Sequence, residues 1–209
     1  MLDLVYLASA FAAIFITVNP ISKVPFFLVL TNGFSRKERH DAIVNAMKVS
    51  IPVLIIFALL GKYIFVAFGV QFLALKIFGG FVLLKIGWDM LRGQMTKFRG
   101  SPEEEEEALD RSMVGVVPLA IPMIAGPGAI ITCMIFVGQA HNAVEVIFIL
   151  LFIVAVVLIA YFLLIEAEKI VERIGKIGIQ TIMRVLGIII ATIGIQTLIN
   201  GAVELAQLF

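Results

Sequence analysis

Two proline-containing stretches lie in the middle of long apolar runs of this chain: TVNPISKVP at residues 17–25 and IPMIAGPGA at residues 121–129. Each proline removes a backbone N–H donor and clashes with the carbonyl group four residues before it, so both helices are expected to unwind locally. Hydrocarbon offers no hydrogen bonds to unwound backbone. We therefore expect both breaks to lie inside protein or against a water-filled cavity.

The composition indicates a membrane protein. Of the 209 residues, 61% are apolar and only 15% are charged, and the mean hydropathy is +1.10. A soluble domain needs a more polar surface than this. The net charge of +1 lacks the basic excess that a nucleic-acid partner requires. The single cysteine, Cys133, has no partner for a disulfide or a metal site. We expect an all-α membrane protein in the lipid bilayer, with no nucleic acid, metal or cofactor.

Six apolar runs are long enough to cross a bilayer, which takes about 20 residues per helix. These runs cover residues 4–31, 43–68, 72–91, 113–138, 144–165 and 183–203. They divide the chain into a first three-helix repeat at 1–92, a cytoplasmic acidic loop at 93–112 and a second three-helix repeat at 113–209. All three parts belong to one integrated membrane domain.

Lysine and arginine residues between the runs set the expected orientation, because they are retained on the cytoplasmic side. The regions after the first, third and fifth runs contain eleven of them, whereas the other connections and both ends contain none. We therefore expect a multi-pass protein of the cell membrane with both termini outside. The acidic run at 103–107 does not change this orientation, since carboxylates count little in the rule.

The two halves of the chain match weakly at offsets of 107 to 109 residues. The matched positions include Asn19-Pro20 with Gly126-Pro127, Lys76 with Arg184, Gly79 with Gly187 and Gly93 with Gly201. Because each half contains three helices, the two copies must enter the membrane from opposite sides, as in many secondary transporters. The sequence thus predicts two inverted repeats in which helices 1 and 4 are broken mid-membrane. Chance similarity between glycine-rich and leucine-rich helices is the alternative.

The paired breaks predict a shared substrate cavity, although kinks that serve packing alone are the alternative. The half-helix after each break presents free N–H groups that attract a carboxylate, and the carbonyl groups before it attract an ammonium group. Lys23 is the one formally charged residue at the breaks, so we expect a substrate that is neutral overall. The predicted substrate-binding residues are Thr17, Asn19, Pro20, Ile21, Ser22, Gly126, Pro127, Gly128, Ala129 and Thr132.

Other polar and small residues have structural or functional interpretations. Lys85 and Asp89 are four residues apart and can pair on one helix face, either as an ion relay or with Lys85 extending to the interface. Gln196 and Asn200 either line the cavity or bond between helices. No buried carboxylate stands out as a proton carrier. The glycines expected to allow close helix packing are Gly79, Gly80, Gly87, Gly187 and Gly194.

The segments NPISKVPFFLVLT at 19–31 and GPGAI at 126–130 resemble the MarC family of integral membrane proteins, which includes neutral amino acid transporters. The resemblance covers essentially the whole chain. It implies uptake or exchange of small neutral amino acids such as glycine and alanine, coupled to a proton or sodium gradient, in a prokaryotic inner or plasma membrane. The family pattern suggests an uncharged residue where this chain has Lys23.

Several functions compete for this sequence. There is no Gly-x-x-x-x-Gly-Lys phosphate loop, so a gradient must drive any transport, and a secondary transporter with alternating access is the leading hypothesis. The alternatives are a channel for ions or small solutes, an efflux carrier for drugs or metabolites, and an assembly subunit that transports nothing. An enzyme is not expected, because the helices carry no Ser-His pair, paired aspartates or His-Glu-x-x-His motif.

Overall fold

The computed structural model describes residues 3–69, 71–93 and 114–207. These residues form helices and short turns, with no strand among them. The expected loop at 93–112, with its acidic run at 103–107, lies almost wholly outside the described residues. The all-α prediction is confirmed for the part of the chain that the structure describes.

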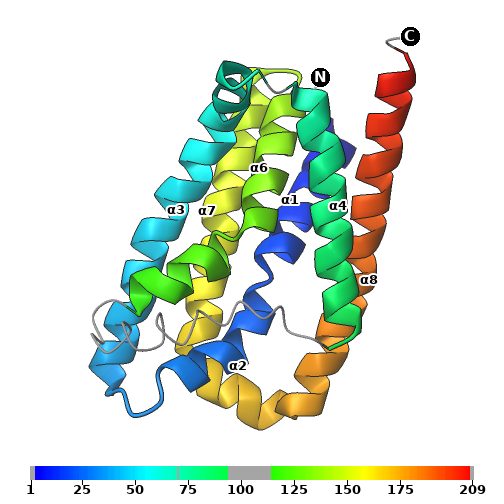
Figure 1. The fold of residues 1–209 in the computed structure, drawn as a ribbon. Coiled ribbons are helices and arrows are strands. Elements are labelled where there is room, and N and C mark those ends of the chain that lie inside the picture. Colours follow the sequence, from blue (N-terminus) through cyan, green and yellow to red (C-terminus); the bar gives the residue numbers. More distant parts are fainter. Residues whose placement is uncertain (1–2, 70, 94–113, 208–209) are drawn as a thin grey trace.

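Each half of the chain begins with a broken segment and continues with two long helices. Figure 1 shows the long helices side by side, with both ends of the described chain at the same end of the bundle. In chain order the elements are α1 (Leu4–Val18), α2 (Pro20–Leu30), α3 (Arg36–Ala67), α4 (Phe72–Leu91), the irregular helical segment η1 (Gly115–Ile124), α6 (Pro127–Gln139), α7 (Ala143–Ile165) and α8 (Ala167–Ala206).

Four stretches are long and apolar enough to span a membrane, and the bent pair formed by η1 and α6 makes a fifth if it counts as one span. The four are Leu4–Leu30, Arg36–Ile64, Ala143–Ile165 and Ile177–Ala206. The six-span prediction is thus supported for five spans at most. The remaining predicted span, α4, carries Lys76, Lys85 and Asp89 within its 20 residues.

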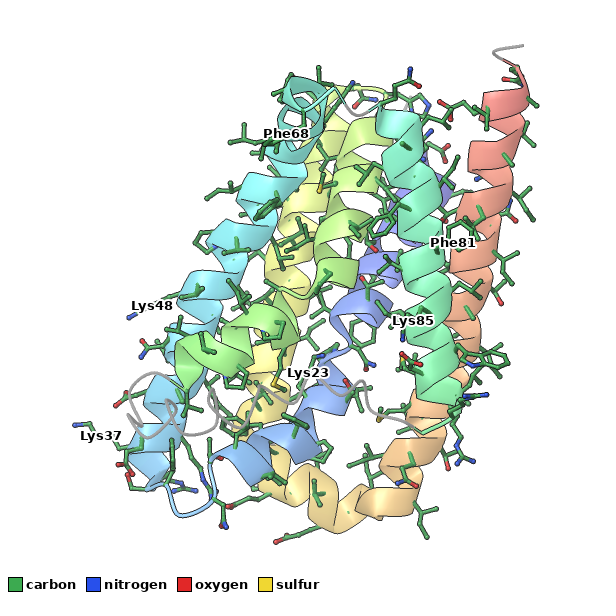
Figure 2. All side chains as sticks on the ribbon, viewed as in Figure 1. Lys23, Lys37, Lys48, Phe68, Phe81 and Lys85 are labelled. Carbon is green, nitrogen blue, oxygen red and sulfur yellow. The ribbon has the colours of Figure 1, made fainter. Side chains whose placement is uncertain are left out.

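Helix α7 shows why these helices suit a bilayer. Its 23 residues are almost all apolar. One face is buried in the bundle through residues such as Ile149, Ile153 and Val157, whereas Ile147 and Leu151 on the other face are exposed. Exposed apolar side chains also extend outward from α4 at Phe81 and from the α3–α4 turn at Phe68 (Figure 2). A helix that is apolar all round and buried on one side only is expected to face lipid on the other.

The expected connection at 166–182 is helical instead. Only Glu166 separates α7 from α8, and α8 changes direction at Gly175, whose φ of +69° suits a residue without a side chain. An ion pair of 2.7 Å joins Lys169 to Glu166 one turn earlier. The charges of this stretch suggested a loop, but its apolar residues at Ile170, Val171 and Ile174 recur at helical spacing. This part of the prediction is wrong.

Small residues bring α4 and α8 into close contact. A side chain at Gly87 would place its Cβ atom 2.5 Å from the backbone nitrogen of Ala191 and 2.6 Å from the carbonyl oxygen of Gly187. One at Gly80 would lie 2.9 Å from the carbonyl oxygen of Gly194. Such close approach is the main source of helix association in lipid. The predicted role of these glycines in packing is confirmed.

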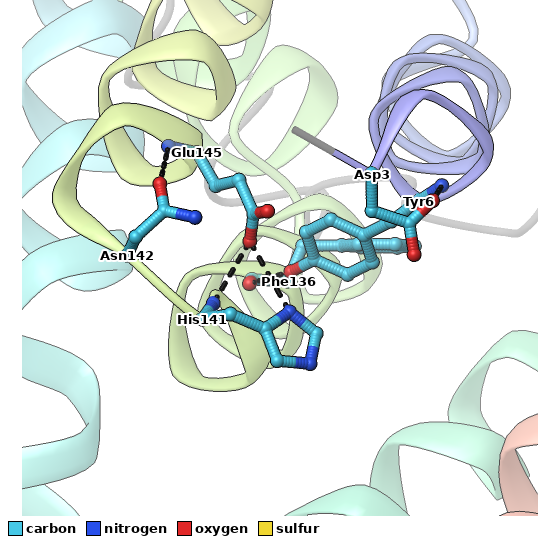
Figure 3. Close-up of polar contacts among 6 residues, drawn as sticks. All are labelled: Asp3, Tyr6, Phe136, His141, Asn142 and Glu145. Atoms are coloured by element: carbon cyan, nitrogen blue, oxygen red, sulfur yellow. Dashed lines mark hydrogen bonds and ion pairs between the residues drawn. The ribbon is translucent and has the colours of Figure 1, made fainter. Parts of the chain in front are cut away.

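Polar residues join the end of the bundle that holds the termini (Figure 3). Asp3 caps α1 by accepting from the backbone N–H of Tyr6 at 3.0 Å, and the Tyr6 hydroxyl donates to the carbonyl oxygen of Phe136. Asn142 caps α7 through the N–H of Glu145 at 3.0 Å. The Glu145 carboxylate accepts from the N–H of His141 at 2.8 Å and is 1% exposed. The Tyr6 bond joins α1 to α6, and the bonds of Asn142 and Glu145 hold the α6–α7 turn beside it.

The contact between α4 and α8 should be sensitive to one added methyl group. We expect Gly87→Ala to lower the melting temperature of the purified protein in detergent, because the new Cβ meets backbone atoms that move only if the helices separate. Overpacking typically costs about 1–3 kcal/mol, which exceeds the helix-propensity gain of about 1 kcal/mol. Gly79→Ala in the same helix is the control, since its Cβ would meet side-chain atoms of Ile131 and Ile135 instead of backbone atoms. Equal melting temperatures for the two variants would contradict this assignment.

Candidate functional site

The first break separates α1 from α2 at Asn19. This residue has φ +50° and ψ +62°, a left-handed conformation that asparagine tolerates better than most residues. Its side-chain oxygen accepts from the backbone N–H of Ser22 at 3.3 Å, and the Ser22 hydroxyl donates to its carbonyl oxygen at 2.9 Å. Pro20 then begins α2 and leaves the Ile16 carbonyl without its helical donor. Pro25 adds no second break, since α2 continues to Leu30.

The second break separates η1 from α6 at Ala125 and Gly126. Gly126 is extended, with φ −77° and ψ 164°, and Pro127 begins α6 after a bend of 54°. The first N–H of α6 to donate to a backbone carbonyl is that of Ile130, which bonds to Gly126 at 3.0 Å. Among the described residues, the buried N–H groups of Gly128 and Ala129 have no hydrogen-bond partner. The start of α6 therefore presents two free donors, as expected for an uncapped helix.

Both breaks line one cavity of about 110 Å³. Helix α4 adds Ile86 and Met90 to its wall, and α8 adds Met183. Seven of the ten predicted residues meet here. They are Thr17, Asn19, Ser22, Gly126, Pro127, Gly128 and Ala129. Pro20 and Ile21 do not line this cavity, and Thr132 lines a different one.

The polar groups around this cavity are mainly hydrogen-bond donors. Lys23 lines it and has no ion-pair or hydrogen-bond partner among the described residues. Asn19 is 6% exposed, and its side-chain nitrogen reaches only the sulfur of Met90, at 3.6 Å. With the free N–H groups at the start of α6, these donors suit a carboxylate. The carbonyl of Met123 lacks its helical donor because Pro127 has no N–H, so it can accept from an ammonium group.

Sequence reasoning missed the residues that complete the cavity from other helices. Phe26 directly follows the stretch at 17–25, whereas Ile86, Met90 and Met183 come from α4 and α8. Nothing in the local sequence of α4 or α8 distinguishes these three from other apolar residues. Only the way in which the α4–α8 pair packs against the two breaks brings them here.

The other charged residues inside spans lie away from this cavity. Lys85 pairs with Asp89 at 2.8 Å, and the Lys85 side chain is 75% exposed. This geometry supports the interpretation of Lys85 as a lysine that extends from the helix surface. Glu145 is a buried carboxylate that the sequence analysis did not single out, but it accepts bonds in the α6–α7 turn and does not line the cavity. Nothing in the sequence position of Glu145, in the first turn of α7, predicted that its side chain would be buried.

The conformation of Asn19 gives a stability test that is independent of transport. Asn19→Gly keeps a residue that adopts positive φ freely, whereas Asn19→Ala places a methyl group in the left-handed region at a cost of roughly 1–2 kcal/mol. Both variants lose the side-chain cap on α2. We expect Asn19→Ala to melt at a lower temperature than Asn19→Gly in thermal unfolding of detergent-solubilised protein. An alanine variant as stable as the glycine variant would contradict the left-handed conformation.

Comparison with known proteins supplies the family. The model of the MarC family integral membrane proteins matches residues 4–206. The chain is 36% identical to UPF0056 membrane protein MJ1677 of Methanocaldococcus jannaschii, over 96% of this chain and 97% of the relative. It is 36% identical to a UPF0056 membrane protein of Pyrococcus abyssi, over 93% and 92%, and 29% identical to UPF0056 membrane protein YhcE of Escherichia coli, over 91% and 89%. No solved structure matches the chain. The chain belongs to the MarC family of integral membrane proteins.

Proposed function

We propose that this protein is a secondary transporter of small neutral amino acids the size of glycine or alanine. It alternates access to the cavity between α1–α2 and η1–α6, and a proton or sodium gradient drives it. The observation that carries this proposal is that two helix breaks, 107 residues apart in the sequence, line the same cavity. Two breaks that served packing alone would not need to line the same cavity. The resemblance to a family that includes neutral amino acid transporters supports the same function.

The size and chemistry of the cavity support this substrate class. A volume of about 110 Å³ is well below the roughly 300–1,000 Å³ of pockets that hold drug-sized ligands. This argues for a substrate of a few heavy atoms over a drug. Lys23 and the N–H groups of Gly128 and Ala129 suit its carboxylate, and the carbonyl of Met123 suits its ammonium group. Glycine and alanine contain both groups within a short distance.

The proposal includes six crossings in two inverted repeats, with both termini outside the cell membrane. On this view α4 is the sixth span, although it carries three charged residues within its 20 residues. Its Lys85 is paired with Asp89 at 2.8 Å, and its Lys76 with Glu204 of α8 at 2.6 Å. Paired charges cost less in a bilayer than isolated ones. Both termini lie at the same end of the bundle, as an even number of crossings requires (Figure 1).

Uptake by proteoliposomes tests the proposed function. We expect saturable uptake of radiolabelled glycine or alanine that shows counterflow, and we expect Gly126→Ala to reduce it at least tenfold. A Cβ atom at residue 126 would lie 2.7 Å from the carbonyl oxygen of Pro122, inside the second break. Gly201→Ala is the control, because its Cβ would meet chiefly the Ile77 side chain, and neither residue lines the cavity. Conductive flux that does not saturate would indicate a channel and end the carrier proposal.

The charge of Lys23 gives a second test. Lys23→Met keeps most of the side-chain volume but removes the ammonium group beside the proposed carboxylate position. A hydrogen bond to a charged group is worth about 1.5–3 kcal/mol, so we expect the half-saturation concentration for glycine to rise roughly tenfold to a hundredfold. Lys48→Met is the control, since Lys48 is exposed and points away from the bundle (Figure 2). An unchanged half-saturation concentration in Lys23→Met would remove Lys23 from the site.

A further inference from the structure

A second cavity, of about 400 Å³, lies between α1, α4, α6 and α8. Its lining residues lie nearer the N-terminus of α1 and the C-terminus of α8 than those of the first cavity. It is therefore on the side of the breaks that faces the two termini (Figure 1). Hydroxyl and amide side chains line much of it: Ser9, Thr132, Gln139, Gln196, Thr197 and Asn200.

Thr132 points to a polar ligand in this second cavity. The residue is 1% exposed, and its hydroxyl oxygen is buried without a hydrogen-bond partner. A buried hydroxyl is normally satisfied, because leaving it unpaired costs free energy. Thr132 follows Ala129 of the first cavity by one helical turn of α6. A solute that moves along α6 would leave the free N–H of Ala129 and meet the free hydroxyl of Thr132.

The charges around the second cavity are balanced. Lys76 reaches its wall, but the ammonium group is paired with the Glu204 carboxylate at 2.6 Å. Gln196 donates to the side-chain oxygen of Asn200 at 2.9 Å, which leaves the oxygen of Gln196 and the nitrogen of Asn200 to bind a solute. This bond lies within α8, and among the described residues neither side chain bonds to another helix, so the structure favours the alternative in which both residues line a cavity. Balanced charges with free donors and acceptors suit a zwitterion better than a lone ion.

One cluster of buried apolar side chains borders both cavities: Met90 and Met183 line the first, and Leu83 lines the second. The two cavities are lined by neighbouring turns of the same helices. On α1, Thr17 lines the first cavity and Ala13 the second; on α4, Ile86 lines the first and Leu83 the second. The buried side chains of Ile16, Leu83 and Ile190 pack in one cluster at this level. A thin apolar constriction between two polar cavities blocks water and polar solutes until its side chains separate.

We propose that the second cavity is the opposite vestibule of the same pathway and a second binding position for the zwitterionic solute. The layer formed by Ile16, Leu83 and Ile190 is the closed gate between the two positions. The solute assignment rests on the proposed function, whereas the prediction that the cavities open to opposite sides of the membrane does not.

Cysteine accessibility tests the two-sided pathway. In a Cys133→Ala background, Ser22→Cys reports on the first cavity and Thr197→Cys on the second. We expect an impermeant methanethiosulfonate reagent to modify them from opposite sides: Thr197→Cys in right-side-out vesicles and Ser22→Cys in inside-out vesicles if both termini are outside, and the reverse if both are inside. Ile199→Cys is the matched control, because it is two residues from Thr197 but exposed on the outer face of α8 and should not react. Labelling of both test cysteines from the same side, or no labelling of Thr197→Cys from either side, overturns the proposal.

Thr132→Val tests the binding position itself. The change keeps the side-chain shape and removes the unpaired hydroxyl. We expect at least a fivefold rise in the half-saturation concentration for radiolabelled glycine added on the side that labels Thr197→Cys. Thr181→Val is the control, since the Thr181 hydroxyl is exposed and donates to the carbonyl of Ile177. Unchanged kinetics in Thr132→Val would overturn the second binding position.

The two proposals fail in different ways. If cysteines label from opposite sides but purified protein shows no thermal stabilisation by any of the twenty amino acids, the substrate assignment fails and the pathway stands. If glycine is transported but Thr197→Cys and Ser22→Cys label from the same side, the proposal of an opposite vestibule fails and the proposed function stands.

Discussion

The structure depends on the inability of hydrocarbon to hydrogen-bond a polypeptide backbone. Helices such as α7 meet this requirement within themselves, so they can face lipid along a whole side. The chain departs from continuous helix inside its apolar runs at Asn19, at Ala125–Gly126 and, within η1, at Val117 and Ile121. The breaks at Asn19 and at Ala125–Gly126 line the same cavity. The cavity thus lies where the unsatisfied backbone requires water, protein or a ligand, and this fixes the position of the candidate site.

Charge imposes a second constraint of the same kind. Lys76 and Lys85 lie on α4, and each has a carboxylate within 2.8 Å. Lys23, by contrast, lines a cavity with no such partner among the described residues. An ammonium group in this environment needs an anion or water nearby, since burial of an unpaired charge is costly. A carboxylate-bearing solute satisfies Lys23 and the free N–H groups of α6 at once.

Local chemistry explains which parts of the site the sequence predicted. Proline and glycine act on their own backbone, so the breaks could be located without knowledge of the fold. From the break at Asn19 into α2, the residues that line the cavity follow helical periodicity through Lys23 to Phe26, which turns Pro20 and Ile21 toward other neighbours. Met183 could not be predicted, because its place depends on how distant helices pack. The partner of Lys76 could not be predicted either, since Glu204 is 128 residues away in the sequence and reaches Lys76 only because α4 packs against α8.

The close contact of α4 with α8 restricts how the proposed gate can open. Backbone atoms of the two helices meet at Gly87 and Gly187, with no side chain between them to yield. Leu83 and Ile190 lie on this pair, whereas Ile16 lies on α1 just before the first break. Separating the pair would break its tightest packing, so the layer opens at lower cost if α4 and α8 move together away from α1. The break at Asn19 then has a mechanical role as well, since a helix that is already interrupted bends there more easily than a continuous one.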